Sequence, residues 1–114
     1  MKDRETTISQ VEVASAFAAL GSEQRLAILE VLVRAGPEGL TTGELGQRSS
    51  VEGSTLTHHL KILTSAGLIR QQKEGRRIVC AAVEFDTVEV LSTYLLRNCC
   101  LDSECTHNGE RPND

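Results

Sequence analysis

The sequence predicts a mainly α-helical domain of about five helices with one small β-hairpin. Apolar residues recur at helical intervals in five segments, and two runs of strand-like residues between positions 68 and 83 flank a polar turn. With 114 residues, of which 39% are hydrophobic and 25% charged, the chain resembles one ordinary soluble domain. We expect residues 1–105 to form this domain and residues 106–114 to be a disordered polar tail. This size excludes two-domain enzymes and the large barrel and doubly wound folds.

The first two helices are predicted from apolar stripes and from the residues that bound them. One helix covers residues 9–20 and is closed by Gly21, and a second begins after Ser22 as its N-cap and stops at Gly36. The side chains expected to line their buried sides are Val13, Ala14, Phe17, Ala18 and Leu20 in the first helix and Leu26, Leu29, Leu32 and Val33 in the second.

The next two helices follow each other closely. Thr41 and Glu44 have the spacing of a capping box, which starts a short third helix held to the core through Leu45. A fourth helix covers residues 53–66 and ends at Gly67. Its inward side chains are Leu56, Leu60 and Leu63, and its outward side chains are Ser54, Thr55, Thr57, His58 and Lys61.

The hairpin has its polar tip at residues 73–76, and a last helix follows it. Cys80 alternates with Ile78 and Ala82 on the apolar face of the second strand, where a free cysteine behaves as a small hydrophobe. The last helix is expected to start at the cap Asp86, with Glu89 three residues on, and to extend to about Asn98. Its apolar stripe is Val88, Leu91 and Leu95.

Charge is unevenly distributed along the chain. The whole sequence carries a net charge of −4, but residues 54–81 contain five basic side chains against the single acid Glu74, and the remainder carries −8. A positive block on an acidic body can direct one face at phosphates. Aromatic residues make up only 3% of the chain, which argues against stacking on single-stranded nucleic acid.

A short helix, a turn, a helix with a polar outer face and a basic hairpin occur in the order of a winged helix-turn-helix. The second helix of such a pair enters the major groove of DNA, where all four base pairs can be distinguished. We expect base-edge or phosphate contacts from Ser54, Thr55, Thr57 and His58, backbone contacts from Lys61, and phosphate or minor-groove contacts from Arg76 and Arg77. The alternative is a helical core with a solvated charged face.

Two strings, LGSEQRLAILEVL from Leu20 and STLTHHLKILTSAGLIRQQKEGRR from Ser54, resemble the ArsR/SmtB family of bacterial metal-responsive repressors. The resemblance covers residues 10–98, and Thr57 keeps a hydroxyl where the family usually has serine. It implies a homodimeric repressor that an inducer releases from operator DNA. It also implies that the first and last helices form the dimer interface, through Val13, Phe17, Val88, Leu91 and Leu95. An intrachain core is the alternative for these residues.

Adjacent histidines occupy the fourth helix. His59 lies at the position of the family's motif histidine and beside the inward-facing Leu60, so we interpret it as a structural histidine rather than a metal ligand. His58 is expected to face the groove.

Three cysteines, Cys99, Cys100 and Cys105, fall within seven residues at the end of the last helix. Neighbours on a helix are about 100° apart, so Cys99 and Cys100 converge only if the helix ends there. Three thiolates suit trivalent arsenic, and also antimony, whereas zinc prefers four ligands and would have to recruit His107, an aspartate or water. The sequence therefore predicts a metalloid site whose inducer is As(III) or Sb(III), with no other cofactor required.

The resemblance to the ArsR/SmtB family also indicates which type of metal or metalloid site the cysteines form. Residues 41–51 contain no cysteine and the last helix contains no histidine, so the arsenic and zinc sites known in other members of the family are missing. The cysteines at the end of the last helix instead resemble those of another arsenic-sensing subtype.

Several alternatives remain open at this point. Within the same fold, the thiols could form a redox or persulfide sensor or a cadmium, lead or zinc sensor. A protein-interaction module would leave the wing cations unexplained. We expect no enzymatic activity, because the sequence lacks a phosphate-binding glycine loop and the common catalytic motifs. The sequence MKDRETTISQ lacks an apolar signal segment, and no stretch is long enough to cross a membrane, so a cytoplasmic protein is expected.

Overall fold

The computed structural model describes residues 8–51, 53–82 and 86–103, with side chains of the last helix from residue 89 onward. It contains the predicted order of helices and wing, and confirms the winged helix-turn-helix fold. The elements are α1 (Gln10–Ala19), α2 (Glu23–Ala35), β1 (Leu40–Thr41), α3 (Thr42–Ser49), α4 (Gly53–Ser65), β2 (Ile69–Glu74), β3 (Arg77–Ala82) and α5 (Asp86–Leu96). In this described part of the chain, no helix has the length and apolarity needed to span a membrane.

Local side-chain caps determine where three helices begin. The hydroxyl of Ser22 accepts from the backbone N–H of Arg25 at the start of α2. The predicted capping box before α3 is complete, because the Thr41 hydroxyl accepts from the N–H of Glu44 at 3.2 Å and the Glu44 carboxylate accepts from the N–H of Thr41 at 2.9 Å. A second capping box, formed by Ser9 and Glu12, begins α1.

The sheet has one strand more than the two-stranded hairpin that the sequence predicts. The short strand β1 pairs antiparallel with β3, in register Leu40 to Cys80, so the order is β1-β3-β2. Two residues carry too little periodicity to be recognised as a strand, and only the pairing with β3 defines them. At the wing tip, Gly75 has a φ of 68° while Arg76 does not lie at positive φ, as in the type II′ turns that join hairpin strands.

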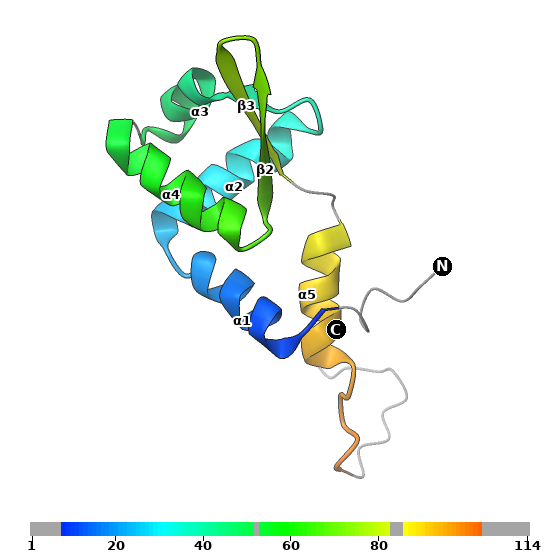
Figure 1. Cartoon of the computed structure of the whole chain (residues 1–114). Coiled ribbons are helices and arrows are strands. Elements are labelled where there is room, and N and C mark those ends of the chain that lie inside the picture. The colour runs from blue at the N-terminus through cyan, green and yellow to red at the C-terminus, as the bar shows by residue number, and fades with distance from the viewer. Residues whose placement is uncertain (1–7, 52, 83–85, 104–114) are drawn as a thin grey trace.

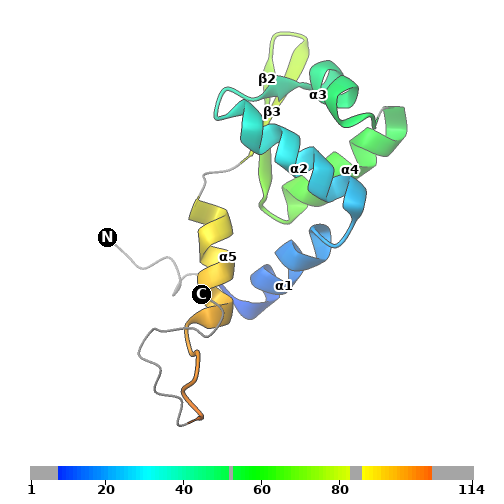
Figure 2. The same ribbon diagram turned by 180° about the vertical axis from the view of Figure 1, so that it is seen from behind.

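Figures 1 and 2 show α3 and the wing at one end of the molecule and α1 and α5 at the other, with α2 between them. One apolar core joins these elements. The fully buried side chains are Ile28, Leu32, Leu45, Leu63, Leu68 and Cys80, and the predicted inward residues Leu56, Leu60 and Leu63 of α4 all belong to the core. The core therefore fixes α4 with its opposite face turned outward.

The structure corrects the predicted stripes of α1 and α2. In α1 the buried residues are Val13, Ala16 and Ala19, whereas Ala14 and Ala18 are exposed and Phe17 is 39% exposed. In α2 the buried residues are Ile28, Leu29 and Leu32, whereas Leu26 and Val33 are 43% and 53% exposed. Both helices offer more than one apolar side, and the neighbouring elements decide which side is covered.

The last helix and the wing show similar differences. Leu91 is 3% exposed but Leu95 is 65% exposed, so the predicted stripe of α5 is only partly buried. The third residue of this stripe, Val88, has a side chain that lies outside the part of the chain that the structure describes. The helix ends at Leu96 rather than near Asn98. On β3, Cys80 is buried as expected, whereas Ile78 is 41% exposed because it lies near the wing tip, beyond the reach of the core.

Candidate nucleic-acid interface and thiol site

The outer face of α4 carries every helical residue predicted to contact DNA. Ser54, Thr55, Thr57, His58 and Lys61 are all exposed. Helical spacing places Ser54, His58 and Lys61 on one side, and the buried leucines hold that side away from the core. The first turn of α4 contains no acidic residue that would repel a phosphate. This face therefore offers hydroxyls, an imidazole and one ammonium to a groove.

One of these hydroxyls also takes part in the helix itself. Thr57 Oγ1 donates to the carbonyl oxygen of Gly53 at 3.4 Å, one turn earlier. Its hydrogen is thus directed along the helix, and its lone pairs remain for a donor outside. Thr57 is accordingly better suited to accept from a base amino group than to donate to a phosphate.

The wing supplies separate positive charge. Arg76 and Arg77 are exposed at its tip. The turn between β2 and β3 lies at the top of Figure 1, near α3 and away from α1 and α5. Arg70 of β2 differs from them, because its guanidinium donates to the carbonyl oxygens of Ala82 and Pro37, each at 3.4 Å. Arg70 therefore ties the wing to the chain before β1.

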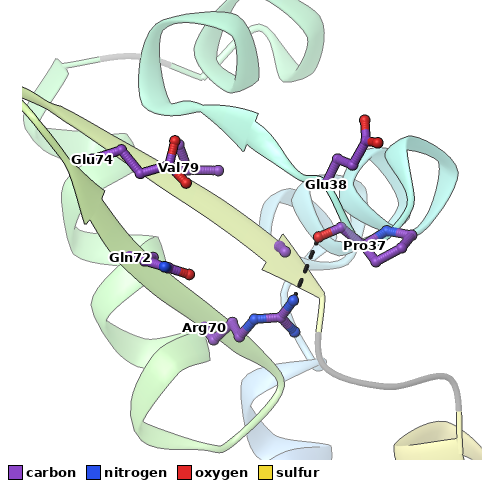
Figure 3. Close-up of a pocket in the computed structure, with 7 residues that line it drawn as sticks. Pro37, Glu38, Arg70, Gln72, Glu74 and Val79 are labelled. Carbon is purple, nitrogen blue, oxygen red and sulfur yellow. Dashed lines mark hydrogen bonds between the residues drawn. The ribbon is translucent and has the colours of Figure 1, made fainter.

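A pocket of about 310 Å³ lies beside this contact (Figure 3). It is lined by Pro37, Glu38, Arg70, Gln72, Glu74, Val79 and Ala81. Its carboxylates and guanidinium are exposed and its lining includes no thiol, so it does not provide the soft ligands expected for a metalloid.

His59 is buried behind the outer face of α4, as predicted for a structural histidine. It is only 8% exposed, its Nδ1 lies 3.3 Å from Nη1 of Arg25, and its Nε2 lies 2.9 Å from Oε1 of Gln24. Burial, followed by the charges of Arg25 and His58, lowers the pKa of His59 below its ordinary value of 6.5. Sequence spacing did not indicate this contact, because Gln24 and Arg25 lie more than thirty residues from His59.

Acidification is expected to destabilise the fold through His59. The imidazole of His59 binds a proton more readily in the unfolded chain than in the folded one. Its contribution to the stability of the fold is therefore fully present above pH 6.5 and is lost as the pH falls through the lower pKa of the folded state. Denaturant unfolding between about pH 7 and 5 should show this loss in the wild type and in H58Q, but not in H59Q. An equal loss in H59Q would contradict the assignment.

Glu44 should affect the stability of the fold at lower pH than His59 does. Hydrogen bonds from the backbone and then the side chain of Thr41 lower the pKa of Glu44 below 4.5, so its contribution is lost only under more acidic conditions.

The adjacent cysteines meet just beyond α5. The chain leaves the helix after Leu96 through turns in which Cys99 N–H donates to Leu96 O at 3.0 Å and Leu101 N–H donates to Asn98 O at 3.1 Å. Cys100 has a φ of 66°, and its Sγ lies 3.4 Å from Sγ of Cys99. The expectation that the pair converges only outside regular helix is therefore confirmed.

Both thiols are exposed to solvent. Cys105, the third predicted ligand, and His107 lie outside the described residues. Within the part of the chain that the structure describes, no three side chains of His, Cys, Asp or Glu gather into a metal site. Cys80 is separate from the pair, since it is buried in the core and accepts from Gln71 Nε2 at 3.6 Å, and burial raises the pKa of its thiol.

The predicted interface residues divide between core and surface. Val13 and Leu91 are 5% and 3% exposed and belong to the core of the chain, which supports the intrachain alternative for these two. Phe17 and Leu95 are exposed, as are Val11 and Leu96 nearby in sequence. In both Figures 1 and 2 the start of α1 lies beside α5. Since Val11 is at this start and Leu95 and Leu96 are in α5, one end of the molecule carries exposed apolar side chains from both helices.

Known proteins resemble part of this chain in sequence. A family described as a helix-turn-helix domain matches residues 20–72. The chain is 40% identical to the uncharacterized HTH-type transcriptional regulator YceK of Bacillus subtilis over 55% of its own length and 62% of that protein. It is 34% identical to the HTH-type transcriptional regulator NmtR of Mycobacterium tuberculosis over 70% of its own length and 64% of that protein. The chain thus spans less than two thirds of the length of either relative.

Solved structures extend the comparison. The homodimeric winged helix-turn-helix domain of a possible ArsR-family regulator from Mycobacterium bovis shares the fold, with a TM-score of 0.62, 22% identity and coverage of 97% of this chain and 96% of that one. An ArsR-like transcriptional regulator from Rhodococcus sp. RHA1 is 32% identical, with a TM-score of 0.63 and coverage of 77% of this chain and 78% of that one. This chain therefore belongs to the ArsR-like family of helix-turn-helix transcriptional regulators.

Proposed function

We propose that this chain is a cytoplasmic transcriptional repressor that binds operator DNA as a homodimer and leaves it when As(III) or Sb(III) binds Cys99, Cys100 and Cys105. The observation that carries the inducer assignment is the distance of 3.4 Å between the sulfur atoms of Cys99 and Cys100 directly after α5. The exposed outer face of α4 and the wing arginines support the DNA assignment.

The ligand set favours a pyramidal ion over a tetrahedral one. Two thiols in contact and a third cysteine six residues beyond Cys99 offer three soft ligands, which suit As(III) or Sb(III), whereas zinc prefers four ligands. Arsenous acid would exchange three hydroxyl groups for three thiolates. Three As–S bonds form, three As–O bonds break, and the thiol protons leave with the hydroxyls as water, without any change of oxidation state.

Exposed apolar side chains of α1 and α5 support the proposal of a dimer. Phe17 of α1 and Leu95 of α5 are exposed in the single chain, and a second copy would cover them. The Mycobacterium bovis domain with this fold is described as homodimeric. In such a dimer, α5 lies both at the subunit contact and next to the thiol pair.

Release follows from this placement. Two recognition helices must match half-sites about one DNA turn, roughly 34 Å, apart. An ion that draws the residues after Leu96 around itself changes the end of α5, and with it the angle between subunits and the separation of the two α4 helices. A coupling of about 1 to 3 kcal/mol, or roughly 5- to 150-fold in DNA affinity, is typical of such linkage.

The test is DNA binding measured by fluorescence anisotropy. Reduced protein is mixed with a labelled duplex from upstream of its own gene and titrated with arsenite, antimonite, cadmium or zinc. Release by arsenite and antimonite but not by zinc would support the proposal. Tight DNA binding that none of the four reverses would contradict the inducer assignment, and a lack of DNA binding would contradict the repressor itself.

The same sulfur distance also favours a second candidate, a repressor that responds to oxidants. Hydrogen peroxide would oxidise the thiols of Cys99 and Cys100 to a disulfide: one S–S bond forms, the O–O bond and two S–H bonds break, and two water molecules are released. This response needs no metalloid and should survive C105S, whereas the three-sulfur site should not. Comparing peroxide with arsenite on C105S separates the two functions.

The wing arginines are expected to contribute through phosphates. Each of R76A and R77A should weaken DNA binding and reduce the slope of log affinity against log salt by roughly 1, since one phosphate contact releases about one counterion. R97A is the charge-matched control, because Arg97 directly follows α5, with its guanidinium over the ring of Tyr94. In Figure 1, α5 lies at the other end of the molecule from the wing tip. Equal salt slopes for all three variants would argue against a wing contact.

A further inference from the structure

One arginine connects three helices of the chain. Arg25, in the first turn of α2, donates from Nε to the carbonyl oxygen of Ala19, the last residue of α1, at 2.7 Å. Its Nη1 lies 3.3 Å from Nδ1 of His59 in the middle of α4. Its own backbone N–H is held by the Ser22 hydroxyl at 3.3 Å. A single side chain therefore connects the end of α1, the start of α2 and the buried side of α4.

The donors and acceptors determine the tautomer of His59. A guanidinium can only donate, so Nδ1 of His59 must accept and carry no proton. The proton of the neutral ring is then on Nε2, which donates to Oε1 of Gln24 at 2.9 Å. Both ring nitrogens are thus used, and within the described residues no buried side-chain N or O atom lacks a partner.

These hydrogen bonds constrain α4 in a way that its apolar contacts do not. The leucines of α4 bury apolar surface, and apolar contacts have no preferred direction. They therefore tolerate small shifts of the helix along its axis and small rotations about it. A bond from a fixed guanidinium to one ring nitrogen has a narrow range of length and angle. His59 is buried and follows the outward-facing His58 directly, about 100° from it around the helix. Its position therefore sets the rotation of the outer face.

We propose that Arg25 and His59 are positioning residues for DNA recognition, which hold the rotation and axial position of α4 relative to the end of α1. This inference rests on the proposed function, because α4 is the helix assigned to the groove. It extends that function by naming the physical connection through which a movement of α1 at the dimer contact reaches the recognition helix.

The test compares DNA affinity among folded variants without inducer. R25K retains the charge but cannot bridge Ala19 and His59 with a planar fork, and H59L removes both ring bonds. H59N retains an acceptor near the position of Nδ1. R34K, on the exposed side of the same helix α2, is the matched control. Circular dichroism at the temperature of the binding assay establishes that each variant is folded.

We expect R25K and H59L each to weaken DNA binding about tenfold while leaving the salt slope unchanged, since no phosphate contact is removed. The double variant should bind no more weakly than the poorer single variant, because both break one connection. H59N should recover part of the loss, and R34K should match the wild type. Long-range ¹H–¹⁵N spectra should show His59 protonated on Nε2 in the wild type and a displaced Nδ1 resonance in R25K.

Other outcomes of these measurements would overturn the proposal. A purely structural role would lower the thermal midpoint of R25K and H59L but leave the DNA affinity of the folded protein unchanged, and this would overturn the proposal. Additive losses in the double variant, or a proton on Nδ1, would overturn it as well. Absence of DNA binding in every protein, including the wild type and R34K, would instead contradict the proposed function, and the spectra would still report whether the connection exists.

Discussion

Replacing Cys99 and Cys100 together by serine is expected to leave DNA binding intact and to abolish its reversal by arsenite. Serine hydroxyls are poor ligands for a soft metalloid, and the two exposed sulfur atoms 3.4 Å apart are the part of the predicted site that the structure describes. The ratio of DNA affinities without and with arsenite, expected at roughly 5 to 150 in the wild type, should fall to about 1. Anisotropy titrations of the reduced proteins measure this ratio directly.

The control for this prediction is Cys80, the buried cysteine of β3. C80A should retain the arsenite response, because that thiol is fully enclosed and burial raises its pKa, which keeps it protonated. The inducer assignment would be wrong if the double serine variant still left DNA at the arsenite concentration that releases the wild type. A loss of response in C80A as well would indicate that the fold, rather than the ligand set, had changed.

Replacing Gly39 by alanine is expected to destabilise the protein strongly. Gly39 precedes β1 with a φ of 74°, and a Cβ atom there would lie 2.3 Å from the carbonyl oxygen of Cys80 and 3.1 Å from Cβ of Ala81. Left-handed strain and the forced separation of β1 from β3 together cost about 2 to 5 kcal/mol. Urea denaturation should show a lower midpoint with an unchanged slope.

Gly43 provides the matched comparison. It lies inside α3, has no positive φ, and a Cβ added there meets no atom within 4 Å. G43A should therefore stabilise the protein by about 0.5 to 1 kcal/mol through the helix propensity of alanine. Equal effects of the two substitutions would show that β1 is not held against β3 in the way that the structure describes.

Local chemistry explains why much of this fold could be predicted. The capping box of Thr41 and Glu44, the cap at Ser22 and the wing turn at Gly75 each involve residues within a few positions of one another, so the sequence contains the whole interaction. The inward leucines of α4 were likewise predicted, because their helical spacing leaves one apolar side.

Prediction was less successful where a segment offered several equivalent choices. Helix α2 carries apolar residues around much of its circumference, and Ile28 was buried in preference to Leu26 and Val33 by the elements that surround it. Strand β1 consists of two residues whose extended conformation depends on β3, some forty positions later. In α5, Leu91 and Leu95 have the same chemistry, yet only Leu91 contacts the core of this chain.

Interactions between neighbouring residues explain why the sequence predicts the order of the helices and the wing, the caps at Ser22 and Thr41, the polar outer face of α4 and a cysteine pair at the end of the last helix. Three features appear only in the folded chain: which apolar sides are buried, the contact of Arg25 with His59, and the 3.4 Å between the sulfur atoms of Cys99 and Cys100. The first two depend on groups distant in sequence. The sulfur distance depends on where α5 ends and on the positive φ of Cys100, which helical spacing does not contain.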